Sequence, residues 1–224
     1  MIPLHDLERP RRPPVVTRLL LALNVAVWLY VLTLLGNEAA LRAFYERWSF
    51  DLAREVAALH EGPGIAALAP LVTHQFVHAG WPHLLGNLLY LWIFGDNVED
   101  RLGHARFLGV YIVCGTAAAL GQGLAGPGPL VGASGAIAGV LGGYLVLSPG
   151  ARVRTLLFLG VFITVVTLPA IVVIGEWIVI QVISGLEMMR IPAGGASGGI
   201  AYVAHVVGFA SGALLVPLLR GRRR

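Results

Sequence analysis

Six apolar segments constrain this chain more than any other feature of its sequence, because each is close to the ~20 residues that a helix needs to cross a hydrocarbon core of ~30 Å. Only 12% of the 224 residues are charged, against about 25% in a soluble domain, and the mean hydropathy is +0.78. The sequence therefore predicts an all-α membrane protein, a polytopic bundle of six transmembrane helices. The segments are residues 16–35, 82–98, 106–125, 131–147, 168–186 and 200–219.

Arginine supplies all sixteen basic residues, and their distribution predicts how the bundle is oriented. An even number of spans leaves both termini on one side of the membrane, and twelve arginines fall on that side. The other four, Arg42, Arg47, Arg54 and Arg190, fall on the opposite side. The positive-inside rule then places both termini in the cytoplasm. We expect a multi-pass protein of a bacterial or archaeal cell membrane.

Two stretches between the segments have a mixed character. Residues 36–81 form a long first outer loop that combines charges with aromatic side chains such as Phe44 and Trp48. This composition suits an ordered loop that is partly inserted in the membrane. Residues 155–166 are apolar, and we expect a connector that lies along the membrane surface. A tilted or broken helix over residues 155–186 is the alternative.

The chain is predicted to be one membrane domain over residues 16–219. Residues 1–15 are rich in proline and arginine, and we expect a poorly ordered cytoplasmic tail. Residues 220–224 form a short basic C-terminus without interleaved aromatic residues, which argues against nucleic acid as a partner. An anionic lipid surface is the partner that such a tail favours.

The fourth and sixth segments carry glycines at a spacing of four residues. Small residues at this spacing let two helices approach closely in lipid. The pattern therefore predicts that these two helices pack against each other. The glycines are Gly135, Gly139 and Gly143 in the fourth segment, and Gly208 and Gly212 in the sixth.

A reactive side chain accompanies each set of glycines. Ser134 directly precedes Gly135, and His205 lies three residues before Gly208, on the same helix face. Histidine is the usual base that activates a serine hydroxyl, and polar groups at membrane depth are a functional hypothesis by default. Helix packing alone is the simpler explanation for the glycines. It does not explain why a hydroxyl and an imidazole accompany them.

Hydrogen-bond donors for a developing negative charge are also available. Ser134 follows a turn at Pro127-Gly128-Pro129, and the backbone N–H groups at the start of a helix have no partner within it. His83 and Asn87 are four residues apart at the outer end of the second segment, so they lie on one helix face. A nucleophile, a base and oxyanion donors are therefore all present.

Together, these motifs resemble those of the rhomboid family of intramembrane serine proteases, over about residues 70–215. The resemblance implies a Ser134–His205 dyad, an oxyanion pocket of His83, Asn87 and the Ser134 backbone N–H, and a structural role for Glu99. It implies no cofactor and no metal. Its implied substrates are single-span membrane proteins, cut within or near the outer part of the bilayer. The matching motifs are Gly132-Ala133-Ser134-Gly135, Ala204-His205-Val206-Val207-Gly208 with Gly212, and His83-Leu84-Leu85-Gly86-Asn87.

Two positions depart from patterns found in some members of that family. A tyrosine four residues after the serine, which stacks on the histidine in those members, is Ala138 here. We expect Tyr202, three residues before His205, as a candidate to orient the imidazole. A Trp-Arg pair of the outer loop is reversed here as Arg47-Trp48 and is not carried over.

Other titratable residues have simpler interpretations. Glu176 falls within the fifth segment, where a carboxyl group is costly unless it faces water, so it is a candidate to support the site from a wet cavity. His74 and His78 are four residues apart, but no third ligand is evident. We therefore expect structural histidines rather than a metal site.

Two other classes of function remain open at this stage. An inactive relative that binds membrane proteins would share the fold, although both Ser134 and His205 are present here. A small-solute transporter or channel would also use polar residues such as Glu176 and Asn87. No internal repeat is evident, which weakens the transporter hypothesis. The sequence leaves the oligomeric state open.

Overall fold

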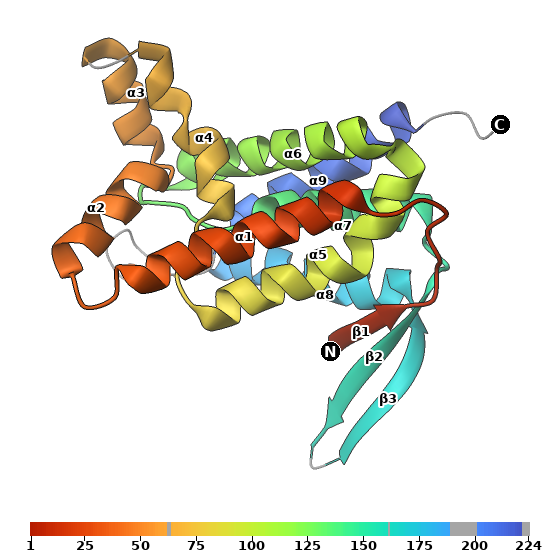
Figure 1. Cartoon of the computed structure of the whole chain (residues 1–224). Helices are drawn as coiled ribbons and strands as arrows, with labels where there is room; N and C mark the ends of the chain where they lie inside the picture. The colour runs from red at the N-terminus through yellow and green to blue at the C-terminus, as the bar shows by residue number, and fades with distance from the viewer. Residues whose placement is uncertain (62–63, 161, 189–200, 221–224) are drawn as a thin grey trace.

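The protein is described by a computed structural model that covers residues 1–61, 64–160, 162–188 and 201–220. Within these residues, six long helices run side by side through the body of the molecule (Figure 1), one in each predicted segment. Residues 200 and 221–224, which belong to the predicted sixth segment and C-terminus, lie outside the described residues. The helices are α1 (Val15–Thr33), α5 (Trp81–Leu102), α6 (His104–Ala125), α7 (Ser134–Leu147), α8 (Ala170–Met188) and α9 (Tyr202–Leu219).

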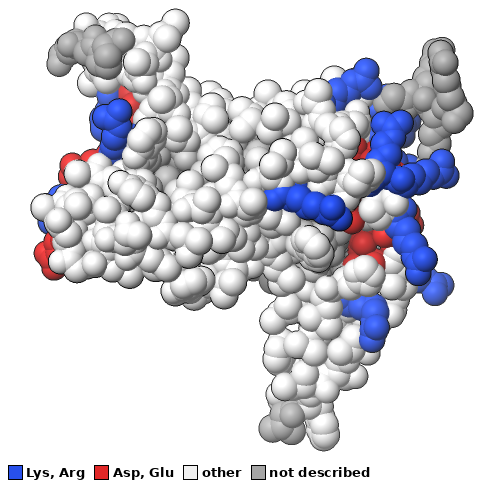
Figure 2. Space-filling view, in the orientation of Figure 1, with Lys and Arg blue, Asp and Glu red and all other residues white. Residues whose placement is uncertain are grey.

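Four of these helices, α1, α6, α8 and α9, are long and apolar enough to cross a membrane. Helix α7 is apolar but shorter, and its residues from Gly135 to Tyr144 are all buried. Figure 2 shows arginines gathered at the end of the bundle that carries the base of the sheet, and an uncharged surface along the middle. This distribution fits an integral membrane protein. The count of six spans and the cytoplasmic termini remain predictions.

The long loop between α1 and α5 folds into short helices. Its α2 packs Phe44 against Trp28 and Val31 of α1, in a cluster that also includes Val77 and Leu84. These contacts form a second hydrophobic cluster, which packs the loop against one end of the bundle (Figure 1). The loop helices are α2 (Glu38–Trp48), α3 (Leu52–Glu61), η1 (Gly64–Leu68), α4 (Pro70–Thr73) and η2 (His74–Phe76).

A three-stranded antiparallel sheet corrects three sequence-based predictions. Strand β1 (Ile2–Asp6) pairs with β2 (Arg152–Leu159), which pairs with β3 (Phe162–Pro169). The all-α prediction is therefore wrong for these residues, as is the expected disorder of the N-terminal tail at residues 2–6. Residues 155–159 and 162–166 belong to these two strands, so the alternative of a helix from residue 155 is wrong there, and the expected position along the membrane surface remains a prediction.

The composition of the hairpin explains this outcome. Its strands are rich in valine, isoleucine, threonine and phenylalanine, which favour strands. Along β2, Arg152 and Arg154 are exposed whereas Val153 and Thr155 are buried, which is the two-residue period of a strand. Average hydropathy does not reveal this alternation, because the residues nearer the hairpin turn are apolar on both faces of the strands.

Asp6 attaches the sheet to the helix bundle. Its side chain is 3% exposed, and its Oδ2 accepts hydrogen bonds from the Tyr144 hydroxyl at 2.7 Å and from Asn97 Nδ2 at 2.8 Å. Burial raises the pKa of Asp6 from its ordinary 3.8 to about 6, outweighing the two hydrogen bonds, and the charge of Glu8 raises it further. The N-terminal strand is thus joined to α5 and α7 through one carboxyl group.

Glu99 caps the first helix from a neighbouring one. Its carboxylate accepts the backbone N–H groups of Val16 and Thr17, both at 2.8 Å, and the Thr17 hydroxyl at 2.7 Å. His104 Nδ1 lies 2.5 Å from the same carboxylate. A negative charge at a helix N-terminus satisfies its free N–H groups and favours the helix dipole. Glu99 therefore fixes where α1 begins relative to α5.

Helices α7 and α9 are in backbone-to-backbone contact at their glycines. A Cβ at Gly208 would overlap the carbonyl oxygen of Gly135, and one at Gly212 would overlap that of Gly139. Because backbone faces backbone, no side-chain movement makes room. At Gly143 the neighbour is instead the side chain of Val216.

We predict that Gly212→Ala lowers the free energy of unfolding by about 1–3 kcal/mol, because the added methyl group must push α7 and α9 apart. Gly109→Ala on α6 is the matched control. A Cβ there meets no atom within 4 Å, and removing glycine from a helix stabilises it by about 0.5–1 kcal/mol. Unfolding in mixed micelles measures both variants. Equal changes in the free energy of unfolding for the two substitutions would contradict the close backbone contact.

A second prediction concerns Asp6 and pH. Because the folded pKa lies above the unfolded one, stabilisation by the neutral carboxyl is complete below 3.8 and is lost as the pH rises through about 6. Asp6→Asn keeps a hydrogen-bond acceptor without a charge. We expect this variant to gain stability relative to the wild type between about pH 4 and about pH 7. Unfolding curves of both proteins at the two pH values test this. The prediction would be contradicted if the difference in free energy of unfolding between variant and wild type were the same at both.

Candidate active site

Ser134 is the first residue of α7, and the loop before it is held at two points. Phe50 and Leu130 exchange backbone hydrogen bonds of 3.0 and 2.7 Å, and the Gly132 N–H donates to the His74 carbonyl at 2.9 Å. Gly132 has a φ of +120°, which a side chain would strain. The outer loop therefore fixes the position from which α7 begins.

The start of α7 leaves backbone donors free. Ala133 is the N-cap, and within the described residues no side chain caps the helix. The first backbone N–H groups of a helix have no carbonyl partner inside it. Ser134 thus lies beside unpaired N–H groups that an anionic group can bind.

His205 lies in the first turn of α9, where its imidazole is 8% exposed. Its Nδ1 is 2.7 Å from Gln181 Oε1 of α8, and its ring centroid is 5.6 Å from that of Trp177. His205 is one turn before Gly208, whose backbone touches that of Gly135. Ser134 and His205 are therefore next to one helix–helix contact.

The described hydrogen bonds do not join the Ser134 and His205 side chains directly. Such bonds between a nucleophile and a base are often long in an unliganded site and shorten when substrate binds.

His83 of α5 covers the loop that leads to Ser134. A Cβ at Gly132 would lie 2.5 Å from both Cε1 and Nε2 of the His83 ring, so the imidazole occupies the place that a side chain would take. The ring also meets His78 edge-on, with centroids 5.1 Å apart. His83 is thus held close to the start of α7.

Asn87 is 8% exposed and donates from Nδ2 to His78 Nε2 at 2.9 Å. Burial, together with the smaller effect of the His83 charge, lowers the pKa of His78 to about 4, so the ring is neutral near pH 7 and can accept. One N–H of the Asn87 amide is engaged in this way, and the described residues provide no hydrogen-bond partner for the other. The sequence reading did not connect His78 with Asn87, because a glycine turn separates them.

The remaining candidates lie elsewhere or act differently. Tyr202 is a candidate to orient His205, but the described hydrogen bond of the ring is donated by His205 Nδ1 to Gln181 Oε1. Tyr202 packs at Gly185 of α8, 3.2 Å from where that residue's Cβ would be. The Glu176 carboxylate is 3.6 Å from the amino group of Met1, directly before β1, and its predicted support of the site remains a prediction.

His74 and His78 of the outer loop have partners inside the protein. His74 Nδ1 lies 2.8 Å from the Pro70 carbonyl, and burial lowers the pKa of His74 to about 4. His78 is bound to Asn87. Among the residues that the structure describes, no group of three or more His, Cys, Asp or Glu side chains has an arrangement that would hold a metal ion.

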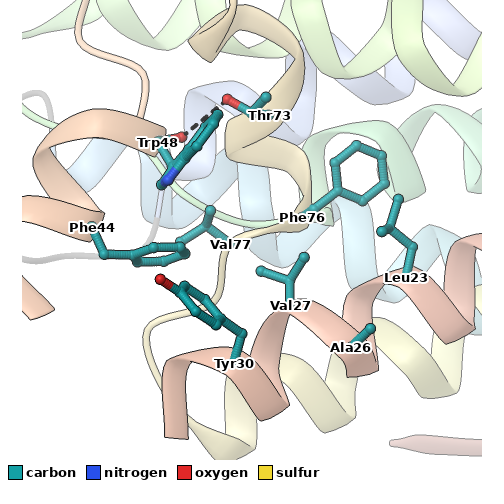
Figure 3. Close-up of a pocket in the computed structure, with 9 residues that line it drawn as sticks. All are labelled: Leu23, Ala26, Val27, Tyr30, Phe44, Trp48, Thr73, Phe76 and Val77. Atoms are coloured by element: carbon teal, nitrogen blue, oxygen red, sulfur yellow. Dashed lines mark hydrogen bonds between the residues drawn. The ribbon is translucent and has the colours of Figure 1, made fainter. Parts of the chain in front are cut away.

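An apolar groove of about 670 Å³ is separate from this site. It lies between α1, α2 and the segment around η2 (Figure 3), and none of the candidate site residues lines it. The side chains around it are Leu23, Ala26, Val27, Tyr30, Phe44, Trp48, Thr73, Phe76 and Val77.

Comparison with known proteins gives consistent matches. The model of the Rhomboid domain family matches residues 66–222. Rhomboid protease GluP of Bacillus subtilis is 35% identical over 114 residues, which cover 51% of this chain and 22% of that protein. Rhomboid-like protein 11, chloroplastic, of Arabidopsis thaliana is 28% identical over 177 residues, which cover 76% of this chain and 59% of that protein. The putative rhomboid protease YdcA of Bacillus subtilis is 43% identical over 77 residues, covering 34% and 39%. The chain thus spans less than two thirds of the length of each of these relatives.

Proposed function

This chain belongs to the rhomboid family, whose members are generally intramembrane serine proteases, and we propose that it cleaves membrane proteins with Ser134 as the nucleophile and His205 as the base. The observation that carries the proposal is the contact of α7 with α9 through Gly135 and Gly208. It brings the two segments that bear these side chains to backbone contact.

In the proposed reaction, the Ser134 hydroxyl attacks a peptide carbonyl while His205 Nε2 takes its proton. The protonated imidazole then gives that proton to the leaving amine, so the peptide bond breaks and an acyl-enzyme remains. Water repeats the cycle with the same base and releases the second product. Each proton that His205 removes is returned, and no cofactor takes part.

The oxyanion that forms on the carbonyl needs fixed donors. The backbone N–H of Ser134, at the free end of α7, is the first, and the second N–H of the Asn87 amide is another. The His83 ring, packed on Gly132, is the third. Donors that are already in place before reaction stabilise this charge most effectively, and the hydrogen bond from Asn87 to His78 supports such an arrangement.

The proposed substrates are single-span membrane proteins with small or helix-breaking residues near the cut. An intact helix hides its carbonyls in internal hydrogen bonds, so a substrate must unwind before Ser134 can attack. The proposed orientation has six spans, both termini in the cytoplasm, and the site toward the outer part of the bilayer. The outer loop that holds the α7 start is consistent with that depth.

We predict that a fluorophosphonate labels purified protein covalently at Ser134, and that Ser134→Ala abolishes this labelling. The same substitution should lower cleavage of a model membrane substrate by roughly 10³-fold or more, since loss of a nucleophile removes the covalent route. Mass spectrometry of the labelled peptide and a cleavage assay are the measurements.

Ser211→Ala is the matched control, because the Ser211 hydroxyl only donates to the Val207 carbonyl within α9. Labelling that persists in Ser134→Ala would place the nucleophile elsewhere. Absence of both labelling and cleavage in well-folded protein would favour a membrane-protein binder without enzymatic activity.

We further predict that EDTA leaves the cleavage rate unchanged, because the proposed steps need only the side chains named above and His74 and His78 already have partners. The rate is measured with and without chelator, and with zinc added back. Strong inhibition that zinc reverses would instead indicate a metal ion bound at His74 and His78.

A further inference from the structure

The imidazole of His205 is held by a residue from another helix. Gln181 Oε1 of α8 lies 2.7 Å from His205 Nδ1, and both side chains are 8% exposed. An amide oxygen can only accept a hydrogen bond. Nδ1 therefore carries the proton of the neutral ring, which leaves the lone pair on Nε2.

A second residue of α8 touches the same ring. Trp177 is one turn before Gln181 and so shares its helix face, and its ring centroid is 5.6 Å from that of His205 at an interplanar angle of 40°. The hydrogen bond fixes one edge of the imidazole, and the indole restricts its rotation. Both constraints come from α8, and neither comes from α9 itself.

We infer that Gln181 is a positioning residue, which holds His205 from α8 in its Nδ1–H tautomer. This inference rests on the proposed function, since it explains how the proposed base is prepared. A neutral imidazole can carry its proton on either nitrogen. Only the Nδ1–H form leaves Nε2 able to take a proton from a hydroxyl.

The position of α8 makes this hydrogen bond sensitive to movement. Its outer face is apolar and exposed at Ile171, Val179 and Ile183, so the helix is packed against the bundle on one side only. A hydrogen bond of 2.7 Å is lost when its atoms separate by about 1 Å more. The hydrogen bond to His205 therefore depends on how closely α8 packs against α9.

The chain offers a matched control for the obvious variant. Gln122 of α6 is also a glutamine that touches α9, and its Oε1 accepts the backbone N–H of Ala204 at 3.2 Å, one residue before His205. Gln122→Met and Gln181→Met each remove one amide acceptor from a contact with α9. Only the second removes a partner of the imidazole.

The experiment compares Gln181→Met, Gln181→Glu and Gln122→Met as full-length protein in micelles. We expect Gln181→Met to lower kcat roughly 10²-fold with little change in KM. Gln181→Glu, which keeps an acceptor oxygen, should recover most of kcat. Gln122→Met should leave kcat within a few-fold of the wild type.

The second readout does not depend on proteolysis. Ring ¹⁵N chemical shifts of labelled histidine distinguish the two tautomers, and the His205 signals are identified by their loss in His205→Ala. We expect the Nδ1–H form in wild type and Gln122→Met, and a mixture in Gln181→Met. A purely structural role for Gln181 would not change this ratio.

The outcomes separate this inference from the proposed function. An unchanged tautomer ratio in Gln181→Met, with the same kcat as Gln122→Met, overturns the inference even when Ser134 is labelled as proposed. If Ser134 is not labelled, the proposed function fails, whereas the ¹⁵N shifts still decide whether Gln181 sets the tautomer.

Discussion

The backbone contact between α7 and α9 is the interaction on which the rest of the structure depends. Gly135 and Gly139 present bare backbone to Gly208 and Gly212, so the two helices approach as closely as their main chains allow. In lipid, where apolar side chains gain nothing by leaving solvent, such close packing is what holds helices together. The same contact sets the distance between the residues at the N-terminal ends of α7 and α9, so packing and the proposed chemistry share one cause.

Helix α7 is fixed at both ends, which suits the element that carries the proposed nucleophile. At its start, the Gly132 N–H binds the His74 carbonyl. Near its other end, the Tyr144 hydroxyl donates to Asp6 of the N-terminal strand. The residues from Gly135 to Tyr144 are all buried. A helix held in this way cannot slide along α9, so Ser134 keeps its position relative to α9.

The sequence predicts those features that depend on residues close to one another in the chain. Apolar length predicts the six helices, and a four-residue glycine spacing predicts which two of them touch. It was misleading at residues 155–166, because hydropathy does not distinguish an apolar strand from an apolar helix, and the two-residue alternation is confined to Arg152–Thr155. It could not reveal Gln181 or the pairing of His78 with Asn87. Those contacts join different elements, and periodicity relates only residues on the same helix.

The difference between α7 and α8 follows from how each is packed. Helix α7 is enclosed, whereas α8 exposes one full face and reaches the core through residues such as Trp177 and Gln181. A protease that admits a substrate from the bilayer needs one element that can yield without disturbing the nucleophile, and a peripheral helix meets that need. Because the His205 imidazole donates its hydrogen bond to Gln181 of α8 and not to α7, the proposed nucleophile and the partner of the proposed base belong to different helices.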